Sequence, residues 1–301
     1  MNAYLNLQYI LVLTATFNNL ECEVVSTTEH PSETSRSDIL LNITRRLDIL
    51  ESQNVKIMAI LNTQPQKNAD PHQSTADYPT DCQDVKSRGH GDSGVYTIQT
   101  KIWPQPFAVF CDMDTRGGGW TYFLHRFDGS RDFYLKWNDY KIGFGSLVGE
   151  HWLGLEYLHQ ITASGDYEML VKMADWDNKV VYAHYKVFVV GSENEGYVLK
   201  AVSGYSGDAG DSMYWYSGMK FTTQDKDQDM RNNSNCAIDE HGAWWYNQCT
   251  RSNPTAMYLK KARDSGIRWK IMYWGTFRDS DYSLKRMTMM VRPRRDKNLE
   301  V

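Results

Sequence analysis

Cysteine content constrains this 301-residue chain more than any other feature, with Cys22, Cys82, Cys111, Cys236 and Cys249. None of them belongs to a CxxC pair or to a Cys/His cluster with zinc spacing, so disulfides in an oxidising compartment are the expected use. The economical pairing is local, Cys82 with Cys111 and Cys236 with Cys249. Each bridge would stabilise the fold by about 3 kcal/mol in the chain-entropy model. Cys22 is left over, and it is either removed with a signal peptide or pairs with another chain.

Residues 1–20 are predicted to be a signal peptide. A short apolar stretch from Leu5 to Leu13 is followed by the small residues Thr14 and Ala15, which suit a signal-peptidase site. The stretch is too short to span a bilayer, and no other segment reaches that length. Because the usual Lys or Arg of the leading region is missing, a buried N-terminal strand or helix is the alternative. We expect a secreted, extracellular protein with no membrane partner.

Residues 39–62 are predicted to form a coiled-coil oligomerisation helix. Its apolar residues alternate in spacings of three and four, as in a coiled-coil seam. Leu40, Leu47, Asn54 and Leu61 take the a positions, and Ile43, Leu50 and Ile57 take the d positions. Three heptads are short for a stable coil, so a helix that folds back on its own domain is the alternative. The single Asn at an a position is a register device, and we favour self-association into a homo-oligomer.

The segments around this helix differ in composition from the rest of the chain. Residues 21–38 are rich in Ser, Thr and acidic residues and form a flexible lead-in. Residues 63–78 contain Pro65 and Pro71 among polar residues and form a linker. Two acceptor sequons predict glycans, at Asn42 beside the seam and at Asn232.

From residue 81 the chain is aromatic and punctuated by Gly, and it is predicted to be globular. The hydrophobic fraction of 41% is enough for one core of about 200 residues. Strands are expected at Ser93–Gln99, Phe107–Cys111, Gly119–His125 and Val180–Val190, with a helix at Ser146–Gln160. This mixture indicates an α+β fold with antiparallel sheets and a loop-rich C-terminal part.

Charge and motifs exclude several classes of function. The net charge of −4, without a dense basic block, makes nucleic acid an unsuitable partner. No nucleophile elbow, zinc-protease motif, P-loop or dinucleotide fingerprint occurs in a supporting context. The adjacent acids Asp239 and Glu240 are interpreted as surface charge. We therefore expect that the protein is not an enzyme.

Short motifs follow one another in a fixed order from residue 81 to residue 285. They include Asp81-Cys82, Ser93-Gly94-Val95-Tyr96, Val109-Phe110-Cys111-Asp112, Gly117-Gly118-Gly119-Trp120, Trp152-Leu153-Gly154-Leu155, Tyr205-Ser206-Gly207-Asp208, Asn235-Cys236-Ala237, Gly242-Ala243-Trp244-Trp245-Tyr246 and Tyr282-Ser283-Leu284-Lys285. In this order the chain resembles fibrinogen C-terminal domains over residues 79–294, which leaves residues 295–301 as a tail. The stretch from Gly242 to Tyr246 is most similar to ficolins, tachylectins and related lectins.

The resemblance implies a fibrinogen C-terminal-like fold and a function in recognition. It implies a calcium-dependent, lectin-like pattern-recognition protein of innate immunity that binds carbohydrate, or groups bearing acetyl or amine functions, on foreign surfaces. A receptor ligand or extracellular-matrix protein of the angiopoietin or tenascin sort, which binds protein partners, is the alternative.

The resemblance also implies a structural Ca²⁺ site. Asp227 and Asp229 would supply carboxylate oxygens, and Arg231 and Asn233 would supply backbone carbonyls. Closely spaced Asp residues with carbonyls are what Ca²⁺ requires, although an acidic turn is more often a solvated loop.

A ligand pocket beside the second disulfide is implied in the same way. Its expected residues are Glu240, Trp245, Tyr246, Thr250, Tyr258 and Asp264, with Trp244 and Trp269 as further aromatic walls. Packing in the core is the alternative role for most of these aromatic residues. Related lectins often carry Tyr and His where this chain has Glu240 and Thr250. The exchange adds a carboxylate, which predicts weak binding of acetylated sugars and stronger binding of amines. A Glu240 that points to solvent and a degenerate pocket are the alternative.

The seam generates a prediction about assembly. The double substitution Leu47→Asp and Leu50→Asp should convert a parallel oligomer into a monomer, because two charges would be buried in the coil. Light scattering measures the mass of both proteins. An unmodified protein that is already monomeric would rule the coiled coil out.

Overall fold

The computed structural model describes residues 11–16, 19–24, 77–261 and 265–294. The predicted coiled coil at 39–62, Asn42, Asp264 and the tail at 295–301 lie outside these residues. Strands β1 (Leu11–Thr16) and β2 (Asn19–Val24) pair antiparallel, with Leu13 opposite Cys22. The signal peptide at residues 1–20 stays a prediction. The pair belongs to a unit separate from residues 70–301.

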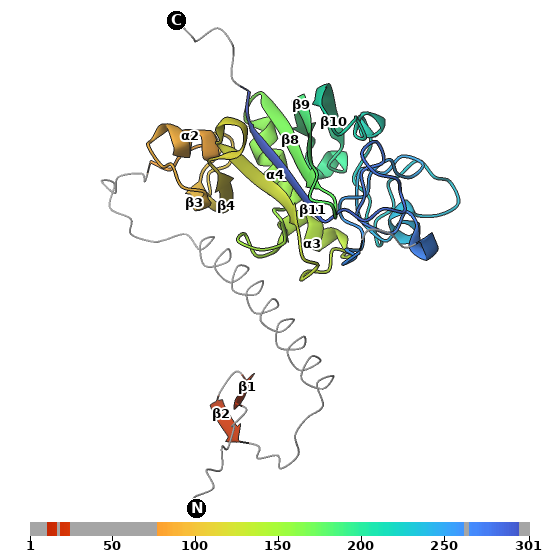
Figure 1. Ribbon diagram of the computed structural model, residues 1–301. Coiled ribbons are helices and arrows are strands. Elements are labelled where there is room, and N and C mark those ends of the chain that lie inside the picture. The colour runs from red at the N-terminus through yellow and green to blue at the C-terminus, as the bar shows by residue number, and fades with distance from the viewer. Residues whose placement is uncertain (1–10, 17–18, 25–76, 262–264, 295–301) are drawn as a thin grey trace, which may run out of the picture. The chain divides into compact units, whose positions relative to one another are not determined.

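The second unit is built on one antiparallel sheet (Figure 1). Its strands run in the order β10, β9, β8, β11, β5, β4, β3, and β7 joins the end of β5 and pairs with β6. Their bounds are β3 (Gly94–Ile98), β4 (Phe107–Asp112), β5 (Trp120–Arg126), β6 (Phe144–Gly145), β7 (His151–Trp152), β8 (Tyr167–Ala174), β9 (Val180–Val190), β10 (Leu199–Gly207) and β11 (Arg286–Pro293). The expected α+β fold with an antiparallel sheet is confirmed.

Four of these strands were predicted, and β3, β4, β5 and β9 confirm them closely. The central strands β8 and β11 were not, because both of their faces are buried and their sequences lack alternation. Met169 and Met289 face the main core, whereas Leu170 and Met290 pack with Trp120 in a small cluster of their own. A strand covered on both sides gives no period-two signal.

Helices are short, and side chains cap the start of some of them. They are α2 (Cys82–Ser87), α3 (Trp137–Ile142), α4 (Leu155–Ala163) and α5 (Cys236–Asp239), together with the 3₁₀ turns η1 (Thr115–Gly117), η2 (Glu193–Glu195), η3 (Tyr214–Tyr216) and η4 (Ser265–Ile267). The Asp81 carboxylate caps α2 by accepting the N–H groups of Gln83 and Asp84. No helix in the part of the chain that the structure describes is long and apolar enough to cross a membrane.

The helix predicted at Ser146–Gln160 is wrong in its first half. Residues His151–Trp152 form β7, and the helix α4 begins only at Leu155. Gly154 explains the break, because its φ of 114° lies outside the helical range and an added Cβ would come within 2.9 Å of the Ile142 carbonyl carbon. From there α4 packs against β9, burying Leu155, Leu158 and Ile161.

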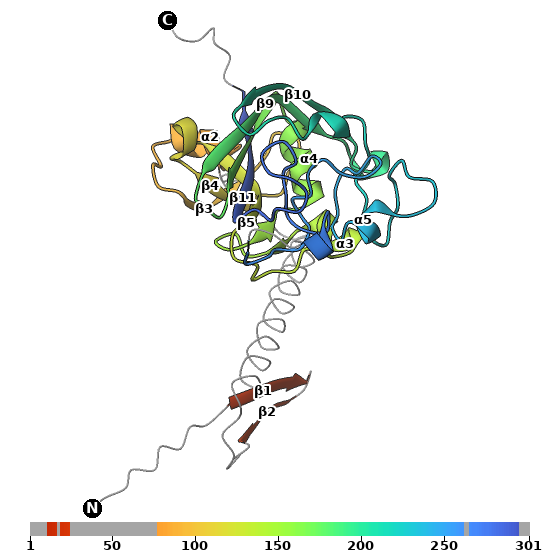
Figure 2. The ribbon, with the colours of Figure 1, turned by 45° about the vertical axis from the view of Figure 1, so that its right-hand side comes forward.

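Residues 208–285 carry loops held by isolated bridges and tight turns, next to the end of the sheet (Figure 2). Thr222 pairs with Trp244, and Met257 pairs with Ile271. Trp244, Trp245 and Tyr246 are fully buried and pack with Trp152 of the sheet in the main core. The expected loop-rich C-terminal subdomain is therefore confirmed, and aromatic packing joins it to the sheet.

A buried ion pair also joins these two parts. Arg126 at the end of β5 is 1% exposed, and it donates hydrogen bonds to the carbonyls of Pro254 and Ala256, each at 3.0 Å. Glu150 lies 3.9 Å from the Arg126 Nε and accepts the N–H groups of Phe127, Asp128, Gly129 and Arg131. Burial lowers the pKa of Arg126, and Glu150 opposes that shift.

We predict that Arg126→Met lowers the free energy of unfolding by about 3–5 kcal/mol, since it leaves the Glu150 charge buried without its partner. Denaturant unfolding followed by tryptophan fluorescence, with disulfides intact, measures the loss. The matched control is Arg294→Met, whose partner Asp166 is exposed, and its cost should stay under about 1 kcal/mol. Equal losses in both variants would contradict the structural role of Arg126.

Candidate functional site

Both predicted disulfides of the globular domain are formed, and the second one organises the candidate site. Cys236 opens α5, where the Asn235 side chain caps the helix by accepting the N–H of Ala237 at 2.7 Å. Cys249 lies 5.5 Å away between Cα atoms. The bridge therefore brings the end of α5 next to residues 248–251. Two pockets open on either side of this segment.

The first, which we call the carboxylate pocket, has a volume of about 590 Å³. It is lined by Met230, Arg231, Asn232, Asn233, Ser234, Glu240, Gln248, Cys249, Thr250 and Trp269. Glu240 directly follows α5, and its Oε2 is buried without a hydrogen-bond partner. Burial, with help from Asp239 and against Arg231 and Lys270, raises the pKa of Glu240 to about 7.

The cation beside this carboxylate is already engaged. Arg231 donates to the Asp239 carboxylate at 3.0 Å and to Cys249 Sγ at 3.2 Å. Because a buried carboxylate without a partner is costly, a donor group that enters the pocket would find an unmet acceptor in Glu240. The pocket is therefore suited chemically to a cationic or hydrogen-bond-donating group.

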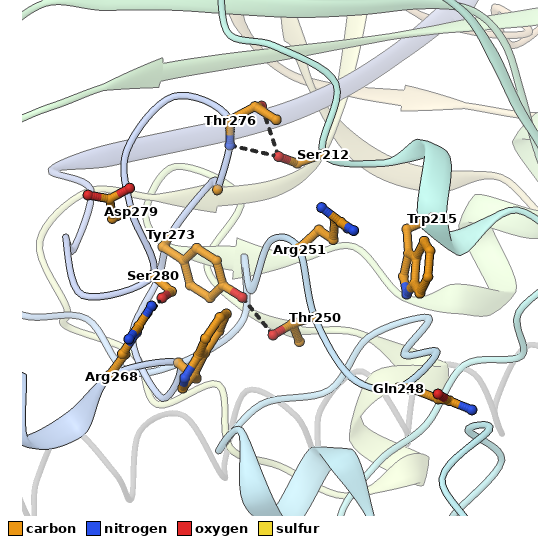
Figure 3. Close-up of a pocket in the computed structure, with 12 residues that line it drawn as sticks. Ser212, Trp215, Gln248, Thr250, Arg251, Arg268, Tyr273, Thr276, Asp279 and Ser280 are labelled. Atoms are coloured by element: carbon orange, nitrogen blue, oxygen red, sulfur yellow. Dashed lines mark hydrogen bonds between the residues drawn. The ribbon is translucent and has the colours of Figure 1, made fainter.

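The second, which we call the arginine groove, has a volume of about 480 Å³ (Figure 3). It is lined by Ser212, Trp215, Gln248, Thr250, Arg251, Arg268, Trp269, Tyr273, Gly275, Thr276, Asp279 and Ser280. The hydroxyls of Thr250 and Tyr273 share a 2.6 Å hydrogen bond in its centre. Gln248, Thr250 and Trp269 line both pockets, so the two adjoin each other.

The expected calcium ligands lie in the loop before α5. The Asp229 carboxylate accepts the N–H groups of Arg231 and Cys236 at 2.8 Å, and Asp227 accepts the N–H of Asp229 at 3.3 Å. Burial foremost, and the nearby Asp227 as well, raise the pKa of Asp229. The described residues contain no group of three His, Cys, Asp or Glu placed for a metal. A cation here would therefore need carbonyl ligands, which is the donor set expected from the sequence.

The structure brings together only part of the predicted ligand pocket. Glu240 and Thr250 line it with Trp269, but Trp245 and Tyr246 are fully buried. Trp245 donates to the Tyr197 carbonyl, and Tyr246 donates to the Asn253 side chain. Tyr258 lies elsewhere and donates to the carbonyls of Phe127 and Lys285. The pocket assignments of Trp245 and Tyr246 were wrong, because each ring fills the core and satisfies its polar atom there. Tyr258 is partly buried and lines neither pocket.

Comparison with known proteins settles the family. A family model described as the C-terminal globular domain of fibrinogen beta and gamma chains matches residues 78–294. The chain belongs to the fibrinogen C-terminal domain family. Fibrinogen C domain-containing protein 1-B of Xenopus laevis is 41% identical over 273 residues, which cover 88% of this chain and 58% of that protein. Angiopoietin-related protein 6 of mouse is 39% identical over 70% of this chain and 46% of that protein.

Solved structures agree with the fibrinogen fold. The fibrinogen-like globe domain of human ANGPTL2 aligns with a TM-score of 0.70 at 39% identity, over 72% of this chain and 99% of that one. Lamprey fibrin D-dimer, complexed with the peptide ligand Gly-His-Arg-Pro-amide, aligns with a TM-score of 0.67 at 29% identity, over 89% and 91%. The chain spans about half the length of the curated relatives it matches. The finer likeness to ficolins and tachylectins is corrected, since these relatives are fibrinogen C domain-containing and angiopoietin-related proteins.

Sequence reasoning missed most of the arginine groove. Arg251, Arg268 and Tyr273 were not named, because they lie in loops without periodicity. One signal in the sequence could have indicated the groove. Tyr214-Trp215 and Arg268-Trp269 place aromatic rings in polar loops, where these rings are exposed and do not serve the core. Trp215 and Trp269 are 36% and 39% exposed.

Proposed function

We propose that this protein is a secreted, lectin-like recognition protein whose fibrinogen domain binds carbohydrate, or groups bearing acetyl or amine functions, on foreign surfaces. The observation that supports it is Glu240, which lines the carboxylate pocket beside the second disulfide and has one carboxylate oxygen, Oε2, without a hydrogen-bond partner. The protein would act by binding and would not carry out chemistry. This proposal includes a role in innate immunity, as the resemblance implied.

A protonated amine is the group that best complements Glu240. Charge-assisted hydrogen bonds are roughly twice as strong as neutral ones, so an amine gains more here than an acetamido group. The pocket has no second carboxylate among its described lining residues, which leaves Glu240 as the selecting charge. The peptide in the lamprey fibrin complex is itself rich in cationic groups. An amino sugar or a peptide amino terminus would satisfy the same acceptor.

Calcium is part of the proposal as a structural ion. Asp227 and Asp229 would hold it with the carbonyls of Arg231 and Asn233, and the ion would neutralise two carboxylates that raise each other's energy. The carboxylate pocket is also lined by Arg231, Asn232 and Asn233, so an ion that orders this loop would shape the pocket wall. A glycan on Asn232, which is exposed there, would narrow the same wall. Assembly through residues 39–62 would add avidity to weak single sites.

A receptor ligand of the angiopoietin sort is the second candidate function. It is favoured by the likeness to angiopoietin-related proteins and to the ANGPTL2 globe domain. A glycan array read with and without chelator separates the two candidates. Calcium-dependent signals on sugars support the lectin, and a blank array supports the protein ligand.

We predict that the protein binds glucosamine resin more tightly than N-acetylglucosamine resin, and that Glu240→Gln removes the preference. Added salt should weaken the amine binding. On an aminoalkyl resin, whose amine stays protonated between pH 6 and 8.5, capture should rise with pH. The sign follows from the pKa of about 7, since Glu240 is mostly neutral at pH 6 and mostly ionised at pH 8.

Glu195→Gln is the matched control, because Glu195 is an exposed carboxylate paired with Lys200 and lines neither pocket. It should keep the amine preference. Tight, salt-insensitive capture on the acetylated resin would contradict the role of Glu240.

We predict that millimolar Ca²⁺ raises the melting temperature of the domain, because an ion that binds the folded state stabilises it by mass action. Asp227→Ala should abolish this gain. Asp225→Ala is the control, since the Asp225 carboxylate is engaged by the Trp137 N–H and the Thr223 hydroxyl. A melting curve that does not change across a chelator titration would exclude the site.

A further inference from the structure

The arginine groove has a net positive lining, whereas the carboxylate pocket beside it is lined by one arginine and one carboxylate, Arg231 and Glu240. The charged residues that line the groove are Arg251, Arg268 and Asp279, two guanidinium groups against one carboxylate. Figure 3 shows Arg251 and Arg268 on opposite sides of the Thr250–Tyr273 hydroxyl pair. The groove therefore carries positive charge at both of its sides around a polar centre.

Neither guanidinium forms an ion pair with the part of the chain that the structure describes. Arg251 lies over the rings of Tyr214 and Trp215, at 5.5 and 5.0 Å from their centroids. Arg268 lies 4.8 Å from the Trp269 centroid and donates from Nε to the Ser280 hydroxyl at 2.8 Å. Stacking restrains each planar group but leaves most of its N–H donors unused. Because the side chains are already restrained, ordering them around a ligand costs less conformational entropy.

We propose that the arginine groove is a binding subsite for a sulfated sugar unit. The guanidinium groups of Arg251 and Arg268 provide forked, charged donors for the sulfate oxygens. The hydroxyls of Thr250 and Tyr273 between them form a polar centre that suits a hydroxylated ring.

A sugar fits this groove better than an acidic peptide. Trp215 and Trp269 are both more than a third exposed, and their rings offer apolar faces to the C–H groups of a pyranose. The groove adjoins the carboxylate pocket through Gln248, Thr250 and Trp269, so neighbouring units of one glycan can reach both. The subsite does not require the amine selectivity of Glu240, because no arginine of the groove lines the other pocket.

The test compares N-acetyllactosamine carrying a 6-sulfate with the unsulfated disaccharide on the full-length protein. We expect the sulfated sugar to bind about tenfold or more tightly, since a charged hydrogen bond contributes that much. Arg251→Gln with Arg268→Gln should remove the difference, and sulfate salts should compete. Both side chains are exposed, so the variants should fold, which their unchanged melting temperature would verify.

Arg294→Gln, an exposed arginine outside the groove, is the matched control and should leave the difference unchanged. Glu240→Gln should also keep the sulfate preference even where it abolishes amine binding, so the two proposals can fail separately. Equal binding of both disaccharides would overturn the inference. So would sulfate selectivity that survives in the double arginine variant, or arginine-dependent binding of a phosphotyrosine peptide without binding of the sulfated sugar.

Discussion

The two pockets depend on the buried contact that Arg126 makes between the sheet and the C-terminal loops. The loops of residues 208–261 and 265–285 form backbone hydrogen bonds but few regular strands, so contacts with the sheet also position them. Arg126 does this at the end of β5 by donating to the carbonyls of Pro254 and Ala256. Those carbonyls lie a few residues after Thr250 and Arg251, which line the pockets. Glu150 keeps the arginine charged and also holds the turn at Phe127–Arg131. The Arg126–Glu150 ion pair thus links the end of β5 to the loops that line the two pockets.

Disulfide chemistry and aromatic packing complete that support. The bridge from Cys236 to Cys249 joins α5 to the segment that separates the two pockets, and Trp244 and Trp245 anchor the intervening chain in the core. These two kinds of support, the disulfide and the buried aromatic residues, explain which assignments from the sequence were confirmed. Cysteines paired locally, as the short separations suggested, because a bridge between close positions needs little from the rest of the fold. The aromatic residues after Cys236 were assigned to a ligand pocket, but their size makes burial in the core worth more than exposure.

The rest of the site could not be derived from the sequence for a related reason. Periodicity reports which face of an element is buried, and the groove residues lie on loops where no period exists. Arg268 and Arg251 are 17 positions apart in the chain and line one groove because contacts such as the Thr250–Tyr273 hydrogen bond and the Ser252–Trp274 bridge hold their loops together. Similarly, β8 and β11 were missed because their two covered faces remove alternation. Glu240 was found because it departs from a family pattern, which is a local signal that needs no knowledge of the fold.

The Glu240 carboxylate and the guanidinium groups of Arg251 and Arg268 lie in adjoining pockets, so one ligand can meet both kinds of charge. Glu240 lies on one side of Thr250 and Trp269, and Arg251 and Arg268 lie on the other. A ligand with the opposite order of charges would place an anion against the carboxylate and a cation against the guanidinium groups, and it would be rejected. Each group alone contributes little in an open pocket, because water competes for it. Under the two proposals, the surface would select the order of charged groups along a ligand more than the identity of any one sugar.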